Sequence, residues 1–227
     1  MTRPLAAGRN FVAMMPQRLA TRLKVTETPL LRIEPTGNAV DMDAEDAAIF
    51  TSSNGVRYAP DGAGRAAFCV GAATTLAASD RGWAAVQMGE TAEALTRKMA
   101  AIPHKQRLFH LSGTHIRGDV VAHLRGVGAN AHRVAVYDQV TCDLTDAART
   151  VLAGDMPVLV PLFSPRTATR FFGQSVDFKK VVVLGLSEAI ADCAPDDLRA
   201  EVIVSSAPDV TAMMKALDQT VDRLASG

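Results

Sequence analysis

The stretch Ala47-Ala48-Ile49-Phe50-Thr51-Ser52 is an apolar run ending in hydroxyl residues, and Val158-Leu159-Val160-Pro161-Leu162-Phe163-Ser164 repeats that arrangement. Each run is followed by a second one that ends in glycine, at Gly71 in the first copy and at Gly185 in the second. Apolar runs of this kind alternate with helix-forming segments along the chain, which predicts parallel sheets covered by helices on both faces. Two similar halves predict two α/β domains facing one cleft, where small ligands usually bind.

Two extended segments interrupt this alternation, at residues 25–34 and 133–144. Pro29 lies within the first, and a proline fits an edge strand or a connecting ribbon better than a central strand. We interpret the two segments as crossings between the domains. Domain one is then discontinuous, with residues 1–30 and 145–227, domain two covers residues 36–132, and a ladder of residues 25–35 and 133–144 joins them.

Composition limits the function classes. The 227 residues suit one large domain or two of about 100 residues each. With 24 basic and 24 acidic residues the net charge is zero, which argues against a nucleic-acid partner. No apolar run approaches the ~20 residues of a membrane helix, and the N-terminus lacks a signal-peptide pattern, so we expect a cytoplasmic protein without a membrane partner. Three widely spaced cysteines are typical of reduced thiols in that compartment.

Familiar catalytic motifs do not fit the chain. Residues 185–189 resemble the nucleophile elbow of α/β-hydrolases, but that fold needs a histidine after the serine and the last histidine here is His132. Gly126-Val127-Gly128 follows a helix pattern and precedes a strand pattern, the reverse of a dinucleotide fingerprint. The five histidines show no zinc-binding spacing. We therefore expect no metal site.

Hydroxyl residues and glycines gather where the predicted strands end. The carboxyl ends of parallel strands form the ligand-binding edge of such a sheet, and free helix N–H groups there attract anions. Arg117 falls in the first turn of a helix predicted from about residue 117, where a cation is unfavourable unless an anion binds nearby. Each serine or threonine alone could be a plain N-cap. Their recurrence in both halves favours an anionic ligand with several charged groups.

An ordered set of motifs resembles the uroporphyrinogen-III synthase family. The motifs are residues 50–56 (Phe-Thr-Ser-Ser-Asn-Gly-Val), 70–74 (Val-Gly-Ala-Ala-Thr), Ser112-Gly113 with Arg117, Val136-Tyr137, 162–166 (Leu-Phe-Ser-Pro-Arg) and 184–187 (Leu-Gly-Leu-Ser). The resemblance extends over nearly the whole chain. It implies two flavodoxin-like α/β domains joined by a two-stranded antiparallel ladder, with the first domain discontinuous.

The resemblance also implies an activity. Such an enzyme is a monomeric, cofactor-free lyase of haem and tetrapyrrole biosynthesis that closes linear hydroxymethylbilane into uroporphyrinogen III. Ring D is inverted and water is lost. The family's proposed route begins with departure of the terminal hydroxyl to give an azafulvene cation. Attack by the substituted carbon of ring D gives a spiro-pyrrolenine, which fragments and closes again with ring D reversed.

Matching the family's motifs also assigns site residues. Tyr137 is the candidate general acid, because a phenol with a reference pKa of ~10 stays protonated at neutral pH. A ladder tyrosine that only packs is the alternative. The substrate carries eight carboxylates, which many hydroxyls and helix N-termini would suit. The implied substrate contacts are Thr51, Ser52, Gly71, Thr74, Gly113, Arg117, Ser164 and Ser187, together with Arg3.

One departure from the family and one alternative function remain. Family members carry an apolar first strand before the Thr2-Arg3-Pro4 segment, and only Met1 precedes it here, so either the start is shortened or domain one has a weakened central strand. The alternative function is a non-catalytic, two-domain protein that closes on a small anion. Such a protein would release its ligand unchanged, whereas a synthase would release a cyclised product.

Overall fold

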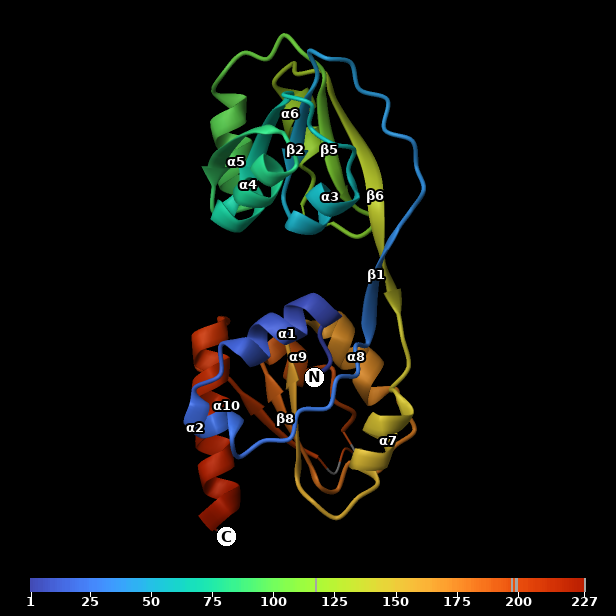
Figure 1. Ribbon diagram of the computed structural model, residues 1–227, viewed down its shortest axis with the longest axis vertical. Helices are drawn as coiled ribbons and strands as arrows, with labels where there is room; N and C mark the ends of the chain where they lie inside the picture. The colour runs from blue at the N-terminus through green and yellow to red at the C-terminus, as the bar shows by residue number, and fades with distance from the viewer. Residues whose placement is uncertain (117, 197, 199, 227) are drawn as a thin grey trace. The chain divides into compact units, whose positions relative to one another are not determined.

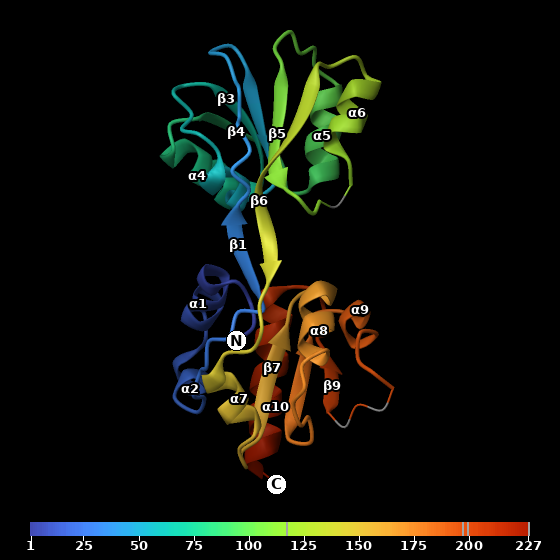
Figure 2. The ribbon, with the colours of Figure 1, turned by 90° about the vertical axis from the view of Figure 1, so that its right-hand side faces the viewer.

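The computed structural model describes residues 1–116, 118–196, 198 and 200–226. The chain forms two compact units, which Figures 1 and 2 show from two sides. Unit 1 comprises Met1–Arg32 and Val140–Gly227, and unit 2 comprises Ile33–Gln139. Both passages between the units fall within strands, in β1 (Leu31–Pro35) and in β6 (Ala131–Thr141).

Unit 2 is built on a sheet with the strand order β1-β6-β5-β2-β3-β4. Strands β2 to β6 pair in parallel, as the alternation of strands and helices predicts. Strand β1 runs antiparallel to β6, because Thr36 N–H donates to the Val136 carbonyl and Cys142 N–H to the Leu30 carbonyl. The remaining elements are β2 (Ala47–Phe50), α3 (Ser53–Tyr58), β3 (Ala66–Val70), α4 (Gly71–Asp80), β4 (Ala84–Gly89), α5 (Ala92–Ala100), β5 (Leu108–Gly113) and α6 (Val120–Gly126).

Strand β2 shows why the strands of unit 2 are almost continuously apolar. Ala48 and Phe50 pack in the cluster shared with α3 and α4, whereas Ala47 and Ile49 pack in the cluster shared with α5 and α6. All four side chains have no exposed surface. A strand covered on both faces has no polar side, so the alternation of an exposed strand is absent.

Unit 1 has a smaller parallel sheet with the order β7-β8-β9. One core packs the sheet against α7, α8 and α9, and the other packs it against α1, α2 and α10. Pro16 separates α1 from α2, as the proline in that helical pattern predicts. The elements are α1 (Leu5–Ala13), α2 (Gln17–Ala20), α7 (Asp146–Leu152), β7 (Val158–Leu162), α8 (Pro165–Phe172), β8 (Val181–Gly185), α9 (Glu188–Ala191), β9 (Glu201–Val204) and α10 (Val210–Ser226).

Strand β7 is at one edge of the sheet of unit 1. The segment before α1 hydrogen-bonds to the chain around Thr28 and Leu30, through the Met1 and Thr2 carbonyls. A mostly apolar cavity of about 700 Å³ lies beside β7, lined by residues of that strand, of α7 and of α10. Among the described residues of unit 1 no strand pairs with the outer edge of β7.

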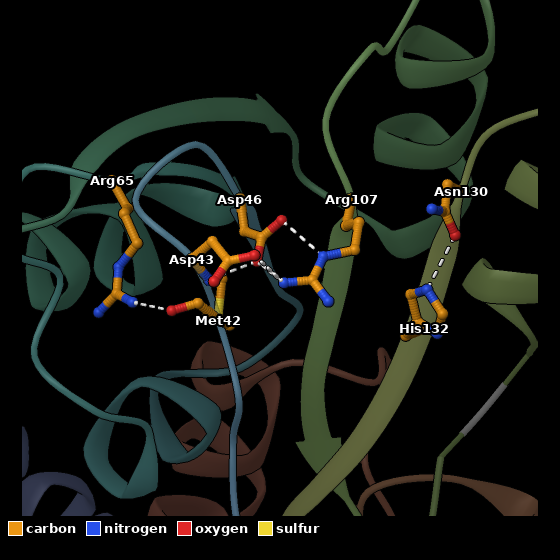
Figure 3. Close-up of polar contacts among 7 residues, drawn as sticks. All are labelled: Met42, Asp43, Asp46, Arg65, Arg107, Asn130 and His132. Carbon is orange, nitrogen blue, oxygen red and sulfur yellow. Dashed lines mark hydrogen bonds and ion pairs between the residues drawn. The ribbon is translucent and has the colours of Figure 1, made fainter.

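A charged cluster lies where β2 and β5 begin, at the end of the sheet opposite to the carboxyl ends of the strands (Figure 3). Arg107 donates from Nε and Nη2 to the Asp46 carboxylate, at 3.0 and 2.6 Å, and from Nη2 to Asp43 at 2.8 Å. Asp46 is buried and also accepts the Asp43 backbone N–H at 2.6 Å. Burial opposes ionisation of Asp46, but these hydrogen bonds and the Arg107 charge outweigh it and hold the pKa of Asp46 below its usual value.

Replacing Arg107 with alanine should lower the free energy of unfolding at pH 7, because the buried Asp46 carboxylate loses its cation. An unfolded aspartate titrates near pH ~3.9. The folded pKa of Asp46 is lower, so the stabilisation is present above that pH and disappears as the pH falls through the folded value. Urea unfolding at pH 7 and pH 3 measures this. The exposed Arg97→Ala variant is the control, and an equal loss at both pH values would contradict the assignment.

Candidate active site

The carboxyl ends of β2 and β5, together with the middle of β6, bring several of the sequence-predicted site residues together in unit 2. Thr51 and Ser52 directly follow β2, and Gly113 is the last residue of β5. Tyr137 of β6 is the register partner of Gly113, after an irregularity in the pairing of these two strands. Figure 2 shows β5 and β6 side by side. These four residues therefore share one edge of the sheet.

Ser52 has two roles at this edge. Its backbone is extended, with φ −159°, and its hydroxyl accepts the Asn54 backbone N–H at 3.2 Å, which makes it the N-cap of α3. Its side chain also lies near the Tyr137 phenol, close enough to oppose the rise in the pKa of that group. The simple capping role considered for the serines thus holds for Ser52, and the Tyr137 phenol lies near this cap.

Tyr137 is a largely buried side chain, 6% exposed. Its ring belongs to the core cluster of α3 and α4 and lies 6.2 Å from the Tyr58 ring, centroid to centroid. Burial raises the pKa of Tyr137, and the nearby Ser52 side chain only partly opposes this. The phenol is therefore protonated at neutral pH, the state that a general acid requires.

Gly113 has a steric role beside Tyr137. A Cβ atom placed on Gly113 would lie 2.7 Å from two carbons of the Tyr137 ring and 3.0 Å from its hydroxyl oxygen. Contacts below 3.0 Å are not tolerated, so only glycine lets the ring approach the end of β5 this closely. This contact explains the glycine without any ligand.

Thr51 is held by a residue that sequence reasoning missed. The Thr51 hydroxyl lies 3.1 Å from Nε2 of His110, which is on the adjacent strand β5 and is 2% exposed. Burial lowers the pKa of His110 to about 4, and the nearby Arg133 charge contributes to that lowering, so the ring is neutral at pH 7. A signal was present in the sequence, since a histidine inside an otherwise apolar buried strand needs a polar partner.

Arg133 is the second missed residue. Its Nε donates to the Ser112 hydroxyl at 3.0 Å, and its Nη2 donates to the carbonyls of Gly113 at 2.6 Å and Thr114 at 2.8 Å. These three acceptors follow one another at the carboxyl end of β5. Arg133 therefore holds this end of the strand in place, next to Tyr137.

The other predicted contacts of unit 2 have different surroundings. Gly71 opens α4 with a φ of +72°, a conformation that favours glycine, and the nearest atom to an added Cβ is 3.7 Å away. Thr74 is 7% exposed, so its side chain is packed inside the unit. Arg117 lies outside the described residues. The helix predicted from about residue 117 begins at Val120 instead, because Asp119 accepts the Ala122 N–H and caps it.

Unit 1 has its own edge of this kind. The Ser164 hydroxyl caps α8 by accepting the Thr167 N–H at 3.2 Å. Ser187 occupies the N-cap position of α9, but its side chain makes no capping hydrogen bond. The Arg3 guanidinium carbon lies 4.3 Å from the centroid of the Phe163 ring, and burial lowers the pKa of Arg3. This edge therefore combines serines at two helix starts with a partly desolvated cation.

The arrangement has counterparts among known proteins. The family model described as Uroporphyrinogen-III synthase HemD matches residues 19–215. The chain belongs to the uroporphyrinogen-III synthase family. The family consists of cyclising lyases of tetrapyrrole biosynthesis that act on hydroxymethylbilane, and the match assigns this activity to the chain. No curated protein sequence matches it.

Solved structures show the same fold. Uroporphyrinogen-III synthetase from Helicobacter pylori has a TM-score of 0.65 and 14% identity, and the alignment covers 87% of this chain and 95% of that chain. Uroporphyrinogen III synthase from the extremely thermophilic bacterium Thermus thermophilus has 15% identity and a TM-score of 0.37, over 100% of this chain and 85% of that chain. The first of these likenesses confirms the predicted fold of two parallel-sheet α/β domains.

The structure can also be searched for a metal site and for a helix that could cross a membrane. Within the described residues, no three histidine, cysteine, aspartate or glutamate side chains are arranged to bind a metal ion. None of the helices in the part of the chain that the structure describes is both long and apolar enough to cross a membrane. All three cysteines are free, and Cys69 is buried in the core of unit 2, where burial raises its pKa to about 11.

Proposed function

We propose that Tyr137 is the general acid of the family's reaction in this chain. Its proton passes to the terminal hydroxyl of hydroxymethylbilane, the C–O bond breaks, and water leaves with the bonding electrons. The products of this step are an azafulvene cation and a tyrosinate next to Ser52. The proton lost when the ring closes returns to the tyrosinate, so the enzyme is regenerated and one water is released overall.

The observation that carries this proposal is the placement of a buried, protonated Tyr137 phenol against Gly113 at the carboxyl end of β5, near enough to Ser52 for that side chain to affect its pKa. Ser52 can donate to the tyrosinate once the proton has left, which stabilises the charge that develops on the phenol oxygen. The raised pKa of Tyr137 keeps the proton in place until the leaving group takes it.

The carboxylates of the substrate are proposed to bind at the edges of both sheets. In unit 2, backbone N–H groups at the start of α3 and the Thr51 hydroxyl are available as donors. In unit 1, the start of α8 at Ser164, the Ser187 hydroxyl and the Arg3 guanidinium are the corresponding groups. Several dispersed donors suit a substrate with eight carboxylates, and a zero net charge does not oppose them. Gly71, Gly113, Thr74 and Arg117 remain predicted contacts.

The proposal includes a monomeric, cytoplasmic enzyme with no nucleic-acid or membrane partner and no cofactor. Three free cysteines suit a reducing compartment. Sedimentation velocity at micromolar concentration tests the oligomeric state, with a single species near 24.0 kDa as the expected result.

Product analysis tests the function. The protein is incubated with freshly prepared hydroxymethylbilane, the products are oxidised, and the porphyrin isomers are separated by chromatography. Isomer III should predominate, whereas closure without protein gives the non-inverted isomer I. Heat-denatured protein is the control. Isomer I alone, at the rate seen in the control, would exclude the synthase activity and favour a binding protein that returns its ligand unchanged.

A further inference from the structure

His110 is a buried polar side chain that the proposed reaction does not yet use. It is on β5, 2% exposed, and its Nε2 atom lies 3.1 Å from the Thr51 hydroxyl. Its Nδ1 atom is buried and has no hydrogen-bond partner among the described residues. A buried polar atom without a partner is costly, so the ring is retained at a cost to stability.

The two neutral forms of the ring have different consequences for Thr51. With the proton on Nδ1, a buried N–H donor would be orphaned, and Nε2 would accept the Thr51 hydroxyl proton. With the proton on Nε2, only a lone pair on Nδ1 is unpaired, and Nε2 donates to the Thr51 oxygen. Buried donors without a partner are rarer in proteins than under-used acceptors, which favours the second form. The ring is neutral because burial lowers the pKa of His110 to about 4.

In the second form the hydroxyl proton of Thr51 has no acceptor on the histidine. The hydroxyl is half-buried at the carboxyl end of β2 and does not cap α3, a role that Ser52 fills. Its proton is therefore free to be donated to a ligand, and the hydroxyl cannot donate it to the histidine instead.

We propose that His110 is a positioning residue, which donates from Nε2 to the Thr51 oxygen and thereby directs the Thr51 hydroxyl proton toward a carboxylate of the substrate. This inference rests on the proposed function, since it deepens the assignment of Thr51 as a substrate contact. His110 itself does not touch the substrate. The Thr51 hydroxyl could otherwise either donate or accept a hydrogen bond. The hydrogen bond from His110 makes it a donor to the substrate, which suits an anionic ligand.

The position of the proton is measured directly by nitrogen NMR of histidine-labelled protein. The chain has five histidines, and the signal that disappears in the His110→Gln variant identifies His110. The expected spectrum has the proton on Nε2 and a bare Nδ1. A proton on Nδ1 would overturn the proposal, whether or not the protein is an active synthase.

Steady-state kinetics with hydroxymethylbilane test the consequence. His110→Leu should raise KM about tenfold with little change in kcat. The reason is that the Thr51 hydroxyl is no longer oriented to donate its hydrogen bond to the substrate carboxylate. His110→Gln places an amide N–H donor near the same point and should recover most of the lost affinity. In the Thr51→Val background, His110→Leu should have no further effect on KM. The exposed His123→Gln variant is the matched control and should keep the KM of the parent protein.

Two kinetic outcomes would overturn the proposal. One is an unchanged KM in His110→Leu, and the other is an equal loss in His110→Gln and His110→Leu, which would indicate that only the shape of the ring matters. Thermal unfolding of each variant identifies loss of folding. If the parent protein forms no isomer III, the proposed function fails, and the NMR result still decides for or against the His110–Thr51 arrangement.

Discussion

Replacing Tyr137 with phenylalanine is expected to slow the formation of uroporphyrinogen III by about a hundredfold or more, the effect typical of losing a positioned proton donor. Phenylalanine keeps the ring that packs against Gly113 and Tyr58. Only the hydroxyl, which lies near Ser52, is removed. The free energy of unfolding should therefore fall by no more than about 1 kcal/mol. Single-turnover rates of isomer III, measured together with urea unfolding, separate the two effects.

The matched control for this experiment is Tyr58→Phe. The Tyr58 hydroxyl donates to the Ile33 carbonyl at 2.8 Å, so this variant removes a phenol hydroxyl from the same unit and loses its hydrogen bond. It should keep a rate close to that of the parent protein. Full activity in Tyr137→Phe would mean that Tyr137 only packs, and that the enzyme acts mainly by holding a conformation of the substrate.

The rate should also respond to pH in a defined direction. A free phenol ionises near pH ~10, and burial raises the pKa of Tyr137 above that value. Loss of the acid form should therefore begin at a higher pH than for an exposed tyrosine. A rate that declines with an apparent pKa below ~10 would exclude Tyr137 as the group responsible.

The Gly113→Ala substitution should lower both the stability of unit 2 and the rate of the reaction. An added Cβ would meet the Tyr137 ring at 2.7 Å, and the ring is enclosed by the core of α3 and α4. Overpacking of this kind costs about 1–3 kcal/mol of stability. Movement of the ring would also break the contact between Ser52 and Tyr137, so the rate of isomer III formation should fall by at least about tenfold. Urea unfolding and the isomer assay measure the two losses.

Two further variants establish the cause. Gly126→Ala adds the same methyl group at the end of α6, where nothing lies within 4 Å of the new Cβ, and should leave stability and activity unchanged. In a Tyr137→Leu background, Gly113→Ala should cost much less stability, because the clashing ring is gone. A parent-like Gly113→Ala protein would show that the ring has room to move.

Much of the architecture could be predicted from local patterns. The run from Ala47 to Phe50 is apolar at every position because helices cover both of its faces, and this pattern is typical of parallel strands. Pro16 ends a helical turn by its own chemistry, so the break between α1 and α2 needed no tertiary information. The N-caps at Ser52 and Ser164 were likewise within reach, since a cap depends on residues close in sequence.

Side-chain contacts between neighbouring strands could not be predicted from the sequence. His110 and Thr51 are 59 positions apart, and Arg133 and Gly113 are 20 positions apart. Thr74 is a polar residue in the first turns of a helix, a position where an exposed side chain is expected. Its side chain is nevertheless packed inside the unit. The helix was predicted to start near residue 117, but α6 starts at Val120. The Asp119 side chain caps the helix and thereby fixes its first turn.

The residue types and their order along the chain were sufficient for the strands, the helices and the position of a hydroxyl-rich edge, since each depends on neighbours within a few positions. Only the packed sheet decided which side chains meet at that edge. The pairing of β5 with β2 brings the His110 ring to Thr51, and the pairing of β5 with β6 presses Tyr137 against Gly113. Such contacts depend on strand register and on close packing between distant segments, which one-dimensional patterns do not carry.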